Sequence, residues 1–118
     1  MHSRGELLAA AWEVARHYRA HRGYGTEDKA CRALRRRRAG FTSRQYLNAF
    51  RKGLALYDAA VDVVARDVLA LHRQTDVQAN RFPAFREQTA EVRPLCPGFQ
   101  ASTYRAALSW VLFWHHLK

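Results

Sequence analysis

Three groups of polar residues have types and spacings that suit chemistry or binding, and the first is a candidate metal site. Glu13, His17 and His21 follow one another at intervals of four within a predicted helix, so they share one helix face. Two imidazoles and a carboxylate at this spacing can chelate a transition metal. The alternative is a solvent-exposed stripe with a Glu–His interaction. Because the sequence supplies no further ligands at a zinc-like spacing, we expect no metal and no other cofactor.

The second group is an arginine and a histidine within one predicted helix. Residues 66–72 read Arg-Asp-Val-Leu-Ala-Leu-His. In this segment Arg66 and His72 resemble the Arg-polar-x-His motif of HEPN-type ribonucleases, which are small helical bundles. The resemblance covers these seven residues. It implies an alternative function for the chain, a metal-independent ribonuclease in which Arg66 and His72 act on the phosphodiester, usually across a dimer.

The third group is a set of basic residues on two consecutive predicted helices. Its members are Arg32, Arg35, Arg36, Arg38, Arg44, Arg51 and Lys52. Guanidinium groups offer planar pairs of donors that suit phosphate and carboxylate, and binding to nucleic acid gains affinity through counterion release. The set therefore predicts a surface for an acidic protein or a nucleic acid. The alternative is a solvated helix face, since no helix-turn-helix, zinc-finger or RNP-type motif accompanies it.

The charge of the chain is unevenly distributed, which favours a binding role for this basic set. The formal net charge is +10, with 20 Lys and Arg, of which 17 are Arg. Residues 1–57 hold 13 basic and 4 acidic residues, whereas residues 58–118 hold 7 and 6. An arginine excess alone can reflect genome composition, but the asymmetry produces a field with a direction.

The end of the chain is rich in large apolar residues. The last predicted helix is apolar nearly all round, with Trp110, Phe113, Trp114 and Leu117 on one side. Such a helix lies either at the centre of a fold or in an interface. We expect these four residues to form a contact between copies of the chain. The alternative is that they belong to the core.

The elements that position these groups are organised around a long predicted helix over residues 43–73. Apolar residues recur along it at alternating intervals of three and four, as in a coiled coil: Leu47, Phe50, Leu54, Tyr57, Val61, Val64, Val68 and Leu71. A second apolar stripe runs through Ala49, Leu56, Val63 and Ala70. Two stripes imply neighbours on two sides, so we expect this helix to be buried by its own chain.

The remaining patterns predict an all-α, single-domain helical bundle spanning residues 1–118. Its four main helices are expected over about 4–22, 27–39, 43–73 and 101–117, with a short helix near 84–92. Ser3, Thr26 and Thr42 are the expected N-caps. Two prolines, Pro94 and Pro97, should keep residues 94–99 from being helical. No internal repeat is evident.

Composition limits the class of protein. Apolar residues make up 48% of 118, which is enough for a hydrophobic core without staples. We expect Cys31 and Cys96 to be thiols in a cytoplasmic protein, since no secretory signal or membrane span is evident. The function we expect is a non-enzymatic, basic helical interaction module with an acidic or polyanionic partner, self-associating through the last helix. The sequence identifies neither the partner nor the process.

Overall fold

The computed structural model describes residues 3–72 and 86–117, and the side chains of residues 3–67 and 87–115. Its helices are α1 (Arg4–His21), α2 (Glu27–Arg37), α3 (Ser43–His72), α4 (Arg86–Leu95) and α5 (Ala101–Leu112), followed by the π-helical turn η3 (Phe113–Leu117). The predicted all-α fold is confirmed. Residues 73, 84 and 85 of the expected helices lie outside the described residues.

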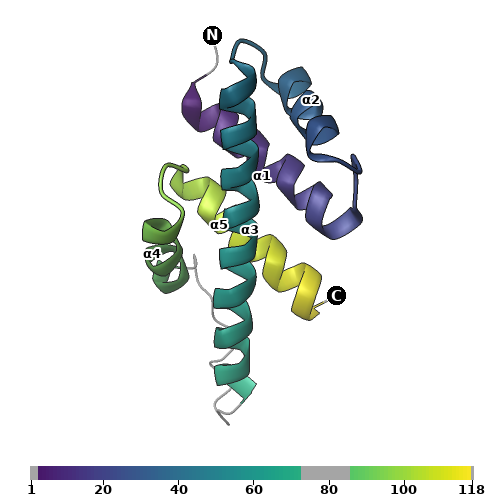
Figure 1. Ribbon diagram of the computed structural model, residues 1–118. Coiled ribbons are helices and arrows are strands. Elements are labelled where there is room, and N and C mark those ends of the chain that lie inside the picture. The colour runs from purple at the N-terminus through teal and green to yellow at the C-terminus, as the bar shows by residue number, and fades with distance from the viewer. Residues whose placement is uncertain (1–2, 73–85, 118) are drawn as a thin grey trace.

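The long helix α3 is the axis of the molecule (Figure 1). In that view α1 crosses behind its upper part and α5 crosses behind its lower part, while α2 and α4 lie to either side. Each of these four helices packs against α3. Helices of its own chain therefore cover α3 as expected, except along the exposed side that carries Arg51, Asp58 and Asp62.

The start of α3 is fixed by hydrogen bonds between residues close in sequence. The Thr42 N–H donates to Oε1 of Gln45 at 2.8 Å, and the Gln45 N–H donates to Oγ1 of Thr42 at 3.1 Å. These reciprocal bonds satisfy two N–H groups that the first turn of a helix otherwise leaves unpaired. The predicted N-cap of α3 is therefore confirmed.

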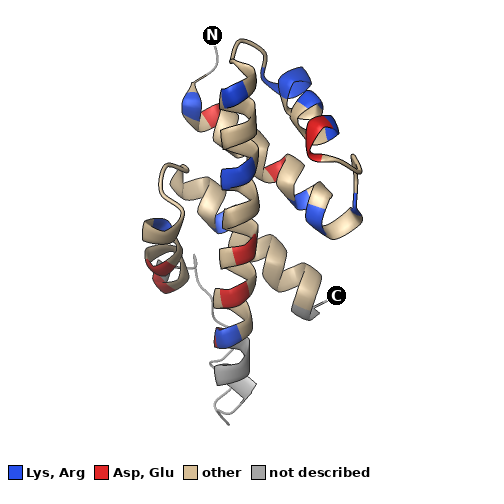
Figure 2. Cartoon of the chain, in the orientation of Figure 1, with Lys and Arg blue, Asp and Glu red and all other residues tan. Residues whose placement is uncertain are grey.

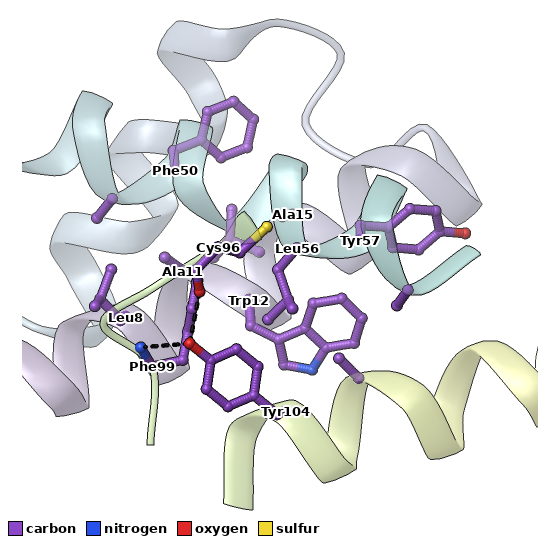
Figure 3. Close-up of a cluster of buried hydrophobic side chains, with 14 of the residues drawn as sticks. Leu8, Ala11, Trp12, Ala15, Phe50, Leu56, Tyr57, Cys96, Phe99 and Tyr104 are labelled. Carbon is purple, nitrogen blue, oxygen red and sulfur yellow. Dashed lines mark hydrogen bonds between the residues drawn. The ribbon is translucent and has the colours of Figure 1, made fainter. Parts of the chain in front are cut away.

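The core lies where α1, α3 and α5 meet (Figure 3). Its largest fully buried side chains include Tyr46, Phe50 and Leu56 from α3, Leu8 from α1 and Tyr104 from α5. In the second apolar stripe of α3, the described residues Ala49, Leu56 and Val63 are all buried. In the coiled-coil pattern every other described residue is only half-buried, namely Leu47, Leu54 and Val61. The buried face of α3 is therefore centred between the two predicted stripes.

Helix α4 does not end where the prolines predicted. It continues through Pro94 to Leu95, so the expectation that residue 94 begins a non-helical segment was wrong. Proline removes one N–H from a helix and leaves the carbonyl four residues earlier without its bond. Here that carbonyl belongs to Ala90, which is exposed to water, and Pro94 falls in the last turn. The helix tolerates proline at that place.

The last helix also differs from the prediction of one regular helix over 101–117. It is α-helical to Leu112 and π-helical from Phe113 to Leu117. In the wider turn the Trp114 ring stacks on the Trp110 ring, with centroids 5.2 Å apart and planes 14° apart. His115 reaches Tyr57, whose hydroxyl oxygen lies 2.9 Å from Nε2 of the imidazole. These contacts to α3 and within the turn accompany the change of helix type.

The turn between α2 and α3 is closed by the side chain of Tyr46. Its hydroxyl donates to the Arg38 carbonyl at 2.7 Å and accepts from the Phe41 N–H at 3.2 Å. The rings of Phe41 and Tyr46 meet edge to face at 5.9 Å, and the Arg35 guanidinium lies 5.2 Å from the centre of the Tyr46 ring. Gly40 supplies the φ of 105° that the turn requires.

The turn between α4 and α5 has the same construction. The Tyr104 hydroxyl donates to the Cys96 carbonyl at 2.6 Å and accepts from the Phe99 N–H at 3.4 Å, as Figure 3 shows. The rings of Phe99 and Tyr104 meet edge to face at 5.7 Å, and the Arg93 guanidinium lies 5.4 Å from the centre of the Tyr104 ring. Gly98 again has a φ of 105°.

These two helical hairpins, α2–α3 and α4–α5, are copies of one structural motif. Each residue of the second turn lies 58 positions after its counterpart in the first (98 against 40, and 104 against 46). The expectation that the chain has no internal repeat was therefore wrong at the level of structure. The repeat provides an internal comparison, because the two hairpins show which residues the motif itself needs.

Candidate functional site

The predicted basic residues lie at one end of the molecule, on α2, the following turn and the first turns of α3. We call Arg32, Arg35, Arg36, Arg38, Arg44, Arg51 and Lys52 the basic surface. Figure 2 shows basic residues on α2 and the upper part of α3, and acidic residues lower on α3 and on α4. Five of the seven side chains are exposed, while Arg38 and Lys52 are half-buried. The structure thus keeps most of this set available to a partner.

Two of the arginines line a cavity between α2 and the start of α3. The cavity has a volume of about 320 Å³, and Arg32 and Arg35 border it together with Ser43 and Tyr46. The Arg35 guanidinium donates to Oγ of Ser43 at 3.0 Å and lies over the Tyr46 ring. Arg35 is therefore held in place, whereas Arg32 makes no ion pair with any described residue. A cation held in advance loses less entropy when it binds an anion.

Other members of the set have intramolecular partners. Nε of Arg51 donates to the Glu27 carboxylate at 2.9 Å, and that bond raises the pKa of Arg51. Arg38 donates to the carbonyl of Arg37 at 2.8 Å, and its own carbonyl receives the Tyr46 hydroxyl. Within the described residues, Arg36 and Arg44 form no ion pair. We conclude that Arg32, Arg36 and Arg44 are the cations most available for an external anion.

Lys52 lies on the opposite flank of α3, beside a second cavity. This cavity has a volume of about 230 Å³ and lies between α3 and the start of α1. Arg4 and Lys52 border it, over walls that include Leu7, Leu8 and Phe41. Sequence reasoning did not include Arg4 in the basic set, because only the crossing of α1 and α3 brings it near Lys52.

Comparison of the two hairpins distinguishes the arginine that the turn uses from the basic residues that it does not need. Arg35 has a basic counterpart, Arg93, and both lie over the tyrosine of their hairpin. The other six positions are not basic in the second hairpin. In order, Arg32, Arg36, Arg38, Arg44, Arg51 and Lys52 correspond to Ala90, Pro94, Cys96, Ser102, Ser109 and Trp110. The motif folds without those six positive charges, so they are not required by the turn.

The predicted interface on the last helix is only partly exposed. Trp110 is half-buried against Trp12 of α1 and Tyr57 of α3, at ring distances of 6.4 and 5.9 Å. Trp114 is half-buried and stacks on Trp110. Phe113 has 56% of its surface exposed. The Leu117 side chain is outside the described set. Among the three members whose side chains are described, Phe113 is the most exposed.

The candidate metal ligands on α1 do not converge. The Glu13 carboxylate accepts a hydrogen bond from Arg37 at 2.5 Å. The rings of His17 and His21 lie 5.4 Å apart, and burial lowers the pKa of His17, with a smaller contribution from Arg16. Among the described residues, no group of three His, Cys, Asp or Glu side chains has a geometry that could hold a metal ion. We do not pursue this site.

Of the candidate ribonuclease pair, the structure describes the side chain of Arg66 alone. The Arg66 guanidinium donates to the Glu91 carboxylate at 2.6 Å and to Asp67 at 3.0 Å. The bond to Glu91 joins α3 to α4 and lowers the pKa of Glu91. The side chain of His72 lies outside the described set. The ribonuclease hypothesis therefore stays a prediction, with Arg66 already engaged in an ion pair.

The comparisons with known proteins add no functional information. No protein-family model, curated protein or solved structure matches the chain.

Neither cysteine is in a disulfide, and burial raises the pKa of both thiols. None of the helices in the described residues has the length and apolar character needed to cross a bilayer.

Proposed function

We propose that this protein is a non-enzymatic interaction module whose basic surface binds a polyanion, either a nucleic acid or an acidic region of a protein. The observation that carries the proposal is the comparison of the two hairpins. Both keep the arginine, glycine, phenylalanine and tyrosine that close the turn, but only the first carries the additional six basic residues. Charges that the hairpin motif does not need, gathered at one end of the molecule, favour a binding role.

The exposure of three of these cations supports the proposal. Arg32, Arg36 and Arg44 are exposed and form no ion pair with a described residue. An anion therefore gains their full attraction without breaking an internal salt bridge. Guanidinium groups bind phosphate and carboxylate through two parallel bonds, so either kind of polyanion suits the surface.

The test measures binding of labelled duplex DNA, heparin and polyglutamate by fluorescence anisotropy at several salt concentrations. We expect affinity for at least one probe to fall steeply between about 50 and about 200 mM salt, because each phosphate contact adds about 0.9 to the slope of log K against log salt. The substitution Arg36→Glu should weaken binding and reduce that slope by about 1. Tighter binding of duplex DNA would favour a nucleic acid as the partner, and tighter binding of polyglutamate would favour an acidic protein.

The second hairpin offers a matched control. Arg105 is exposed on α5 and corresponds to Leu47, outside the basic surface. Arg105→Glu changes the net charge by the same amount as Arg36→Glu and should leave affinity nearly unchanged. Equal losses for the two variants would mean that total charge drives binding, and the proposal would fail. So would an absence of binding to all three probes at low salt.

A single-stranded RNA probe in the same assay tests the alternative function. The interaction module should leave the RNA intact in the presence of a chelator. Cleavage of the RNA that disappears in Arg66→Gln would instead support the ribonuclease.

Self-association through the last helix remains a further proposal. It is supported by the exposed Phe113, and light scattering of Phe113→Ser tests it.

A further inference from the structure

A second exposed apolar side chain lies far from the last helix. In the described part of the chain the exposed large apolar residues are Leu95, with 66% of its surface accessible, and Phe113. Leu95 ends α4 and borders a shallow groove of about 580 Å³ between α4 and α3. The groove also has Ala55, Ala59 and Val63 along it. Leu95 thus shares one groove with other apolar side chains, unlike a surface leucine that stands alone and needs no explanation.

The rim of this groove is acidic, and we call the whole feature the acidic groove. Its carboxylates come from Asp58, Asp62 and Glu91, and Arg66 lies among them. Asp58 pairs with Arg19 at 2.9 Å, and Glu91 pairs with Arg66. Asp62 is exposed and forms no ion pair with a described residue. The groove therefore suits an apolar pocket with a basic rim.

The cavity between α2 and α3 has that complementary character. Its apolar walls are Cys31, Tyr46 and Leu47, and its basic rim is formed by Arg32 and Arg35. With a volume of about 320 Å³ it has room for a leucine side chain. Each surface also carries one residue of the opposite sign, Asp28 in this cavity and Arg66 in the acidic groove. The cavity lies beside the first turns of α3, at Ser43, Tyr46 and Leu47, whereas the acidic groove runs along its middle from Ala55 to Arg66.

We propose that a second copy of this chain inserts its Leu95 into the cavity between α2 and α3, with Arg32 and Arg35 facing the carboxylates of its acidic groove. A contact between two different surfaces of the same chain is heterologous, so an open chain of any length keeps one free groove at one end and one free cavity at the other. The association is head to tail and yields short chains or rings. Because one leucine and a few ion pairs make a small contact, we expect transient association that strengthens at low salt.

This inference rests on the proposed function in one respect, since both use Arg32. A polyanion on the basic surface must exclude the second copy. Addition of heparin should therefore dissociate the head-to-tail assembly. The two ideas still fail separately, because the acidic groove has no part in polyanion binding. Leu95→Ser should abolish the head-to-tail association and leave heparin affinity unchanged.

The first experiment is sedimentation velocity of the full chain across a range of protein concentrations at low and high salt. We expect concentration-dependent oligomers at low salt that dissociate at high salt. Leu95→Ser should raise the dissociation constant about tenfold or more. The experiment is repeated in a Phe113→Ser background, which removes the separate contact proposed for the last helix, and Leu95→Ser should cause the same loss of association there. A strictly monomeric wild type, or oligomers insensitive to Leu95→Ser, would overturn the inference.

A mixing experiment distinguishes a head-to-tail contact from any symmetric one. Leu95→Ser removes the inserting side chain and keeps the cavity intact. Arg32→Glu impairs the cavity and keeps Leu95. With Phe113→Ser also present in both variants, each variant alone should be monomeric, and an equimolar mixture should form a heterodimer that cannot grow further. Circular dichroism of each variant verifies the fold. A mixture that stays monomeric, although both variants are folded, would contradict the proposal.

Discussion

Gly53 of α3 lies against the backbone of Ala11 of α1 so closely that no methyl group fits between them. A Cβ placed on Gly53 would lie 2.6 Å from the carbonyl oxygen of Ala11 and 3.0 Å from Cβ of Ala15. Real Cβ atoms do not approach backbone oxygen this closely, and backbone cannot swing aside as a side chain can. The crossing of the two helices is therefore fixed by this glycine and by the small residues opposite it.

We predict that Gly53→Ala destabilises the fold by about 1–3 kcal/mol, because relief of the clash must separate α1 from α3. This loss outweighs the gain of about 1 kcal/mol that alanine normally brings to a helix interior. Gly5→Ala is the control. Its Cβ would meet the flexible end of the Gln100 side chain, so that variant should be neutral or more stable. Urea denaturation of both variants measures the difference, and equal destabilisation would contradict the explanation.

The tyrosines that close the two hairpins should differ in their contribution to stability. Tyr104→Phe leaves the buried Cys96 carbonyl and Phe99 N–H without a partner, which costs about 1–3 kcal/mol. The bonds of Tyr46 are only partly buried, so water can replace its hydroxyl in Tyr46→Phe at a cost of less than about 1 kcal/mol. Thermal unfolding of the two variants checks the order. A larger loss for Tyr46→Phe than for Tyr104→Phe would contradict this order and its explanation by burial.

The structural repeat leaves only four matching residues in the sequence, an arginine, a glycine, a phenylalanine and a tyrosine at the same spacing in residues 35–46 and 93–104. The bonds that define it end on backbone carbonyls, those of Arg38 and Cys96. A carbonyl oxygen is the same in every residue, so side chains as different as arginine and cysteine occupy equivalent positions. By contrast, the start of α3 was predictable because its capping bonds join Thr42 and Gln45 through their own side chains, only three residues apart.

The sequence identified which residues form the basic surface, but it did not identify the contacts that tertiary packing creates. The pattern of basic residues on two helix faces identified Arg32, Arg36 and Arg44, which are exposed as expected. The ion pair of Arg66 with Glu91 depends on how α4 packs on α3, and no local pattern joins residues 25 positions apart. The same holds for the cavity that Arg4 and Lys52 share. Contacts of this kind are set by tertiary packing rather than by spacing.

The ion pair between Arg66 and Glu91 should make the docking of α4 depend on acid. The hydrogen bond from Arg66 lowers the pKa of Glu91, so the folded state holds the charged carboxylate more strongly than the unfolded chain does. This contribution is present above the unfolded pKa and is lost as the pH falls through the lower folded pKa. The protection factors of the α4 amides, which correct for the intrinsic slowing of exchange in acid, should therefore fall as the pH is lowered. Arg66→Gln should show lower protection already at neutral pH, with less further change in acid.

Histidine 17 should make the fold less stable under mildly acidic conditions. Burial lowers its pKa from the ordinary value of 6.5, with further lowering by Arg16, His21 and Arg37 and an opposing effect of Glu13. Above the unfolded pKa the imidazole is neutral in both states and has no effect on stability. As the pH falls below 6.5 the unfolded chain takes up the proton first, so stability decreases until the folded pKa is passed.

We therefore expect the wild type to lose more stability than His17→Gln when the pH is lowered from about 7.5 to about 5. Urea denaturation at both pH values measures the two losses, and an NMR titration of the His17 ring gives its pKa directly. His21→Gln is the comparison variant, because it removes a neighbouring positive charge and should raise the pKa of His17. An identical pH dependence in wild type and His17→Gln would show that the His17 proton is not linked to folding.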